Sequence, residues 1–130
     1  MRFEFAFDKK YLPALAAIGV TPITAHVDLS EDTLDARFGP WRCRTPITNI
    51  KCVRQTGPYS ALKAIGARGS FADRGATFGT TTAGGVCVEF RDPVKILDPS
   101  GIILHPGLTL TVADRDAFEE AVRAQTPLDR

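Results

Sequence analysis

The chain has 130 residues, 44% of them hydrophobic and 24% charged, which is the composition of a globular domain rather than of a disordered chain. No stretch approaches the ~18 consecutive apolar residues that cross a membrane, so no transmembrane segment is expected. Residues 1–8 alternate in hydrophobicity, carry acids and lack the pattern of a signal or transit peptide. We therefore expect a cytoplasmic protein.

The net charge of +1 conceals a basic middle segment between two acidic ends. Residues 36–91 hold nine cations and two acids, a net charge of +7, whereas residues 1–35 and 92–130 each carry a net charge of −3. Such a segregation can mark a face for an anionic partner. It can equally describe a solvated surface whose cations pair with the acidic ends in the folded chain. The sequence pI near 7.7 gives no strong nucleic-acid signal.

Three cysteines, Cys43, Cys52 and Cys87, form an odd set without CxxC spacing, which favours free thiols in a reducing compartment. Zinc ligands usually come in close pairs, so neither a metal nor another cofactor is expected. The two histidines, His26 and His105, have no cysteine close to them in the sequence, so no catalytic pair is predicted.

The first third of the chain alternates between apolar and polar residues, as half-buried strands do. A strand is predicted through Phe3, Phe5 and Phe7, followed by a short helix at residues 12–18. Gly19 provides a stop for that helix.

Two further strands are predicted at residues 24–30 and 34–38, with Ala25, Val27 and Leu29 pointing inward. The acidic residues between these strands are expected to turn the chain back on itself.

Proline interrupts the following segment twice. Gly39–Pro40 breaks the strand, since proline cannot donate to a central ladder and favours an edge or a bulge. Beyond it, the alternation places Arg42 and Arg44 on an outward face until Thr45–Pro46 ends the run, and another strand is predicted at residues 50–54. The two proline pairs would leave an exposed strand edge, to which a protein segment or a second copy of the chain could add a strand.

The second half of the chain predicts more short strands and a closing helix. In order, these are a helical patch at 60–65, strands near 70–72, 76–82 and 86–90, a loop at 92–107, a strand at 108–112 and a helix at about 114–124. A hairpin turn is expected at Ala83–Gly85, and Asp114 is expected to cap the helix, which docks through Phe118 and Val122. Together, these elements predict a mainly β fold, a small antiparallel barrel or sandwich with a C-terminal helix, in a single domain over residues 1–130.

Several short motifs have a familiar spacing. Leu34–Trp41 ends a strand in Gly-Pro, and Thr45–Ile50 turns into the next strand, while Ser70–Gly75, Gly85–Phe90 and His105–Leu108 are further short matches. The first two motifs resemble bacterial pleckstrin-homology-like domains, and the others are similar to a family of small actinobacterial proteins. The resemblance covers residues 20–124 and implies a fold more than a function.

Two positions depart from the pleckstrin-homology pattern. Domains of that class that bind phosphoinositides carry basic residues at the first hairpin turn, whereas here the turn is Ser30–Asp32, with two acids. An acidic turn would repel a phosphorylated head group, so lipid binding at this turn is not carried over. Phe118 stands where a tryptophan is usual on the closing helix and keeps its packing role.

Basic and aromatic side chains of the middle segment form the candidate binding face. They are Arg42, Arg44, Arg54, Tyr59, Lys63, Arg68 and Arg74. Arginine forks suit phosphate and carboxylate groups, so an anionic small molecule or an acidic protein segment is the expected ligand. The sequence thus favours a non-enzymatic binding or scaffolding domain with no catalytic residue. The alternative is an enzyme or small-ligand carrier with a pocket at the barrel mouth, lined by Trp41, Tyr59 and His105.

Overall fold

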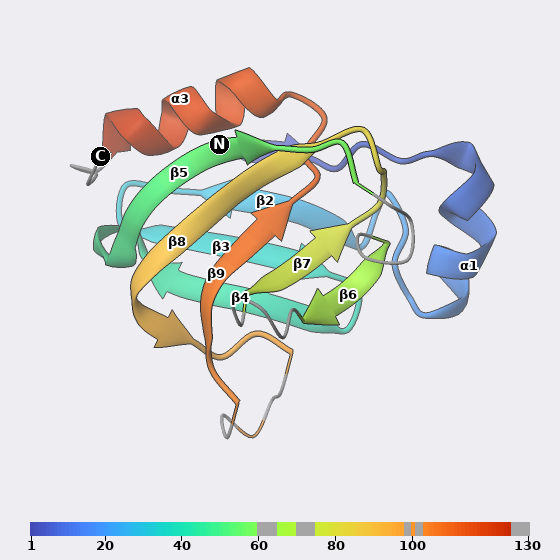
Figure 1. Cartoon of the computed structure of the whole chain (residues 1–130), viewed down its shortest axis with the longest axis horizontal. Helices are drawn as coiled ribbons and strands as arrows, with labels where there is room; N and C mark the ends of the chain where they lie inside the picture. Colours follow the sequence, from blue (N-terminus) through green and yellow to red (C-terminus); the bar gives the residue numbers. More distant parts are fainter. Residues whose placement is uncertain (60–64, 70–74, 98–99, 101–102, 126–130) are drawn as a thin grey trace.

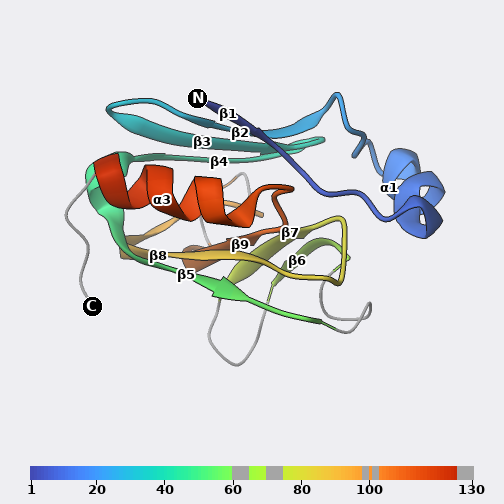
Figure 2. The ribbon, with the colours of Figure 1, turned by 90° about the horizontal axis from the view of Figure 1, so that it is seen from above.

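Two β-sheets face each other in the computed structural model, with one helix along their open side (Figures 1 and 2). The residues described are 1–59, 65–69, 75–97, 100 and 103–125. The first sheet has the order β1-β2-β3-β4, formed by Arg2–Glu4, Ala25–Leu29, Thr33–Phe38 and Trp41–Pro46. The second sheet has the order β5-β8-β9-β7-β6, formed by Ile50–Thr56, Gly85–Val94, His105–Leu110, Ala76–Gly79 and Gly66–Gly69. The helical elements are η1 (Lys9–Tyr11), α1 (Leu12–Ala17), η2 (Ile47–Asn49) and α3 (Arg115–Gln125).

This architecture confirms the predicted mainly β sandwich with a C-terminal helix. The sheets do not close into a barrel; among the described residues, one isolated bridge, between Phe5 and Val112, joins the chain beyond β1 to the chain beyond β9. Strand pairing is antiparallel among the described strands except between β7 and β9, which run parallel. The predicted hairpin at Ala83–Gly85 is therefore wrong, because β7 pairs with β9 and β6 and not with β8.

The core lies between the two sheets and consists of the inward side chains of their strands. Ala25, Val27 and Leu29 are buried as the alternation predicts. Phe38 of β3 stacks on Phe78 of β7, with ring centroids 4.8 Å apart, so these two rings connect the two sheets.

Helix α3 fills the side of the sandwich. The Asp114 carboxylate accepts a hydrogen bond from the Ala117 N–H at 3.1 Å, which confirms the predicted N-cap. Phe118 and Val122 are fully buried, as predicted, and the Phe118 ring meets Phe3 edge-on at 5.1 Å. None of the helices in the described ranges is long and apolar enough to cross a membrane.

The Gly39–Pro40 pair is a hairpin turn and not a bulge. Phe38 pairs with Trp41 across it, so β3 returns directly as β4. Gly39 has a φ of +59°, and a Cβ there would lie 2.7 Å from the Gly19 carbonyl oxygen. Only glycine fits this position, as the first residue of a type II′ turn requires. The turn leaves β4 as the last strand of its sheet.

Two predicted elements lie partly or wholly outside the described residues: the helical patch at 60–65 and the strand at 70–72. Between them, Gly66–Gly69 forms β6, which the sequence did not predict. The predicted loop at 92–107 is shorter in the structure, because β8 continues to Val94 and β9 already begins at His105.

Candidate functional site

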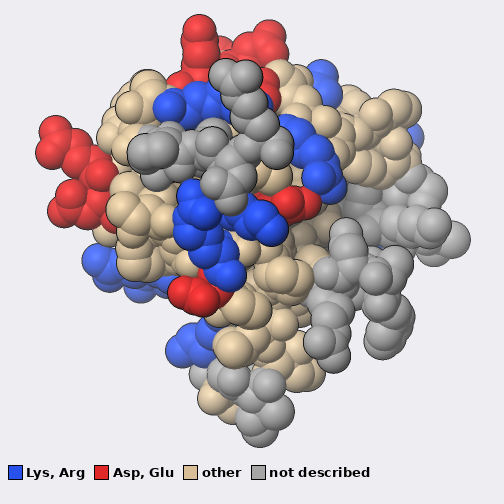
Figure 3. Space-filling view, turned by 60° about the vertical axis from the view of Figure 1, so that its left-hand side comes forward, with Lys and Arg blue, Asp and Glu red and all other residues tan. Residues whose placement is uncertain are grey.

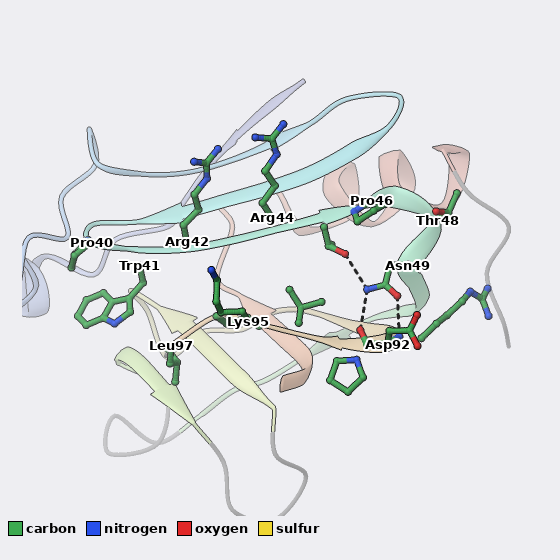
Figure 4. Close-up of a pocket in the computed structure, with 15 residues that line it drawn as sticks. Pro40, Trp41, Arg42, Arg44, Pro46, Thr48, Asn49, Asp92, Lys95 and Leu97 are labelled. Atoms are coloured by element: carbon green, nitrogen blue, oxygen red, sulfur yellow. Dashed lines mark hydrogen bonds between the residues drawn. The ribbon is translucent and has the colours of Figure 1, made fainter. Parts of the chain in front are cut away.

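An open groove of about 1120 Å³ runs along the free edge of β4 (Figure 4). Its other wall is the end of β8 and the segment that follows it. The lining residues are Pro40, Trp41, Arg42, Arg44, Thr45, Pro46, Thr48, Asn49 and residues 91–97. Because β4 has a strand partner on one side only, alternate backbone N–H and C=O groups of β4 face the groove.

One end of the groove is apolar. Trp41 and Leu97 come from opposite walls and lie near each other at this end (Figure 4). Both side chains are half-buried and pack against the core, and the Trp41 ring lies 6.5 Å from the Phe38 ring. An apolar side chain of a ligand would fit between them.

The other end of the groove is fixed by one amide side chain. Asn49 of η2 donates from Nδ2 to the Thr45 Oγ1 and to the Asp92 carbonyl oxygen, both at 3.0 Å. Its Oδ1 accepts a hydrogen bond from the Asp92 N–H at 2.9 Å. These three bonds tie the end of β4 to β8 across the sandwich, so the two walls of the groove are held at a set separation.

Cations outnumber acids among the described residues that line the groove. Lys95 extends into the space beneath β4, whereas Arg42 and Arg44 rise from β4 away from it (Figure 4). Arg42 donates two hydrogen bonds to the Asp35 carboxylate, of 2.7 and 2.9 Å. Arg44 has no carboxylate within 4 Å among the residues that the structure describes. Lys95 thus places a positive charge inside the groove, and Arg44 adds one at its rim.

The Arg42–Asp35 pair makes a pH-dependent contribution to stability. The hydrogen bonds from Arg42 hold the pKa of Asp35 below its ordinary value of 3.8. A lowered folded-state pKa stabilises the fold above the ordinary value, and this stabilisation is lost as the pH falls through the folded value.

We therefore expect Asp35→Asn to cause a small loss of stability at pH 7, which shrinks as the pH falls below about 4, where the Asp35 carboxyl of the unfolded wild type becomes protonated. Urea unfolding of both proteins at pH 7 and pH 3 measures this difference. Arg42→Gln, which removes the partner, should give a similar loss at pH 7. An Asp35→Asn difference that persists undiminished at pH 3 contradicts the role of this ion pair.

The structure separates the predicted binding residues. Arg42 and Arg44 lie at the groove, but Arg54 lies on β5 in the other sheet, where its Nη1 donates to the Glu89 carboxylate at 2.9 Å. Arg54 therefore does not lie beside Arg42 and Arg44, because β4 and β5 belong to different sheets. Basic and acidic side chains are interspersed on the face shown in Figure 3 and do not form one basic patch.

Two other predicted residues, Tyr59 and Arg68, are also absent from the groove lining. The half-buried Tyr59 shares a hydrogen bond with the Thr56 hydroxyl. Arg68 on β6 donates from Nε to the Ile65 carbonyl oxygen at 2.6 Å. Lys63 and Arg74 fall outside the described residues.

The three residues predicted to line the alternative pocket also lie apart from one another. Trp41 lines the groove, whereas Tyr59 and His105 lie beside opposite ends of β8, next to Gly85 and Val94 respectively. These three side chains do not line one cavity. Lys95 and Leu97, which the sequence analysis missed, line the groove with Trp41 instead.

The outer face of the second sheet carries a cluster of thiol and charged groups. The Cys52 thiol donates to Glu89 Oε2 at 3.0 Å, next to the bond from Arg54. A smaller hollow of about 260 Å³ adjoins this cluster. Burial, and then the Glu89 carboxylate, raise the pKa of Cys52 to about 11, so its thiol stays protonated at neutral pH. Burial raises the pKa of Cys43 to about 12.

We expect Cys52 to react with iodoacetamide at pH 8 about a hundredfold more slowly than an ordinary exposed thiol, because only the thiolate attacks. Glu89→Gln should speed the reaction, since the neutral amide no longer opposes ionisation of the thiol. Mass spectrometry of the digested protein measures Cys52 separately from the other cysteines. Equal rates in wild type and Glu89→Gln would mean that Glu89 does not hold the proton on Cys52.

Within the described ranges, no group of three or more His, Cys, Asp and Glu side chains is placed to hold a metal ion.

No family model matches the chain, and no solved structure matches it. A phosphate propanoyltransferase of Rhodobacter capsulatus is 38% identical over 63 residues, which is 48% of this chain. The match spans 27% of that protein's length, about a quarter of it. The resemblance to pleckstrin-homology-like domains stays an expectation from the sequence.

Proposed function

We propose that the protein is a non-enzymatic binding domain that captures an extended, acidic protein segment by strand addition to β4. The observation that carries this proposal is the position of β4, which is the outermost strand of its sheet and also one wall of the groove. A segment lying in the groove would pair its main chain with the free edge of β4, which gives affinity without requiring a particular sequence.

The side chains around the groove supply the selectivity. Trp41 and Leu97 offer a place for one apolar side chain of the segment at one end. Lys95 lies along the path of the segment, and Arg44 lies at the rim. Among the described residues that line the groove, Asp92 is the one acid, and its backbone N–H and C=O are both bonded to Asn49. Charge complementarity therefore favours carboxylates on the bound segment.

Trp41 is the chain's one tryptophan, so its fluorescence reports directly on the groove. The probe is a capped ten-residue peptide of alternating valine and glutamate, here called the valine–glutamate peptide. We expect a saturable change in Trp41 emission that weakens as salt rises, because screening reduces the charge attraction. A matched valine–lysine peptide should cause no such change. Equal responses to the two peptides, or no response to either, would contradict the proposal.

A second candidate function, from the class of enzymes and ligand carriers, is binding of a small phosphorylated or acylated molecule. Its support is the partial likeness to a protein whose name specifies phosphate and a propanoyl group. The groove is also large enough for such a molecule. Isothermal titration with propanoyl phosphate tests this candidate: binding that Lys95→Ala abolishes would support it, and the absence of any binding heat would remove it.

A further inference from the structure

The segment from α1 to the start of β2 forms an apolar knob at one end of the molecule. Residues 12–24 contain no charged side chain. In Figures 1 and 2, α1 projects beyond the ends of both sheets. Ile23 is 87% exposed and Ile18 is 44% exposed, so two large apolar side chains of the knob face solvent.

These isoleucines are not displaced core residues, because the knob already has its own anchors. Leu15 is 1% exposed and Val20 is fully buried, and both belong to the main hydrophobic core. Gly39 also packs closely against the backbone of Gly19. The knob is therefore firmly seated, and Ile18 and Ile23 are presented on a fixed support.

Three backbone N–H groups between α1 and β2 donate to acceptors within this segment. Val20 N–H donates to the Leu15 carbonyl at 2.9 Å, and Thr21 N–H donates to the Thr24 hydroxyl at 2.8 Å. Ile23 N–H donates to the Thr21 hydroxyl at 3.3 Å. These N–H groups can therefore leave water without losing their hydrogen bonds, which lowers the cost of placing the segment in a medium of low polarity.

The charges nearest to the knob in the sequence are positive. Lys9 and Lys10 are exposed in η1, which runs directly into α1. Asp8 before them accepts a hydrogen bond from the Thr81 hydroxyl at 2.9 Å and is thereby held against the body of the protein. The acidic turn at Ser30–Asp32 follows the far end of β2, whereas the knob precedes its near end.

We propose that this knob docks the protein on an anionic lipid surface, with Ile18 and Ile23 in the interfacial region and Lys9 and Lys10 against the headgroups. Exposed apolar side chains beside lysines are the combination that binds such surfaces. A projecting tip suits a lipid surface, which adapts to its shape, better than a protein partner, which would need a matching pocket. The proposal is independent of the function proposed for the groove.

Flotation with vesicles of phosphatidylcholine alone, or with 30% phosphatidylglycerol, tests the proposal on the full chain. We expect binding to the anionic vesicles and little to the neutral ones. Ile23→Asp should lower the partition coefficient by about tenfold or more, because it replaces an inserted apolar group with a charge. Leu104→Asp is the matched control: Leu104 is 47% exposed, lies just before β9 in the other sheet and should leave binding unchanged.

Two further variants separate insertion from charge attraction. Lys9→Glu with Lys10→Glu should reduce binding to anionic vesicles by at least about fivefold. Ile23→Trp in a Trp41→Phe background places one fluorophore at the tip, and we expect brominated lipids to quench it in anionic vesicles.

Absence of vesicle binding by the wild type, or full binding by Ile23→Asp, would overturn the proposal. So would self-association that depends on Ile23 without vesicle binding, because that result would assign the knob to a protein partner.

Discussion

Replacing Phe38 with alanine should lower the free energy of unfolding by about 3–5 kcal/mol, the largest stability effect that we expect from one substitution. Phe38 is fully buried, its ring stacks on Phe78 of the opposite sheet, and the rings of Phe5 and Trp41 lie 5.4 and 6.5 Å from it. Alanine would leave a cavity where the two sheets meet, and neighbours held by their own strands cannot close it.

Urea unfolding followed by far-ultraviolet circular dichroism measures this loss without relying on Trp41 fluorescence. Phe7→Ala is the matched control, because Phe7 is only partly buried against the same core. It should cost clearly less than Phe38→Ala. Equal losses for the two variants would contradict the central position of Phe38 between the sheets.

Reversing two charges at the groove should have the largest effect on ligand binding. Arg44→Glu combined with Lys95→Glu should weaken binding of the valine–glutamate peptide by at least about tenfold, since attraction at two positions becomes repulsion. Both side chains belong to the groove lining, and both are exposed, so the fold should tolerate the change.

Arg54→Glu combined with Arg68→Glu provides the control with the same change of net charge. These arginines lie on β5 and β6, outside the groove lining, although the sequence grouped them with Arg44. Trp41 fluorescence titration at low and high salt measures both pairs. If the control pair weakens binding as much as the groove pair, general charge and not the groove attracts the peptide.

Local features of the fold could be predicted from the sequence because they depend on neighbouring residues. Alternation placed Val27 and Leu29 in the core, since side chains of a strand alternate between its two faces. Asp114 was recognisable as a cap because a helix start leaves N–H groups that a nearby carboxylate can accept. Neither inference needs knowledge of distant parts of the chain.

Strand order could not be predicted in this way. Nothing in Ala76–Gly79 shows that it runs parallel to β9, because that pairing is made with residues about thirty positions away. For the same reason, the sequence did not show that Arg44 and Arg54, grouped in one candidate face, lie in different sheets, although η2 carries the chain from one sheet to the other between them.

The groove was predicted in part. The prolines at positions 40 and 46 correctly indicated a strand edge, and Trp41, Arg42 and Arg44 do line the groove. The sequence did not predict Lys95 and Leu97 as groove residues, because they follow β8 in a stretch rich in proline that indicated a loop. Their role depends on β8 passing opposite β4, a long-range contact that local patterns do not encode.

Amide hydrogen exchange by NMR, with and without the valine–glutamate peptide, tests strand addition to β4 most directly. The groove-facing amides of β4 alternate with amides that already bond to β3. We predict that saturating peptide protects alternate amides between Trp41 and Thr45 and shifts the resonances of residues 94–97. Unchanged exchange along β4, with the peptide-induced shifts confined to the outer face of β5 and β8, would contradict strand addition.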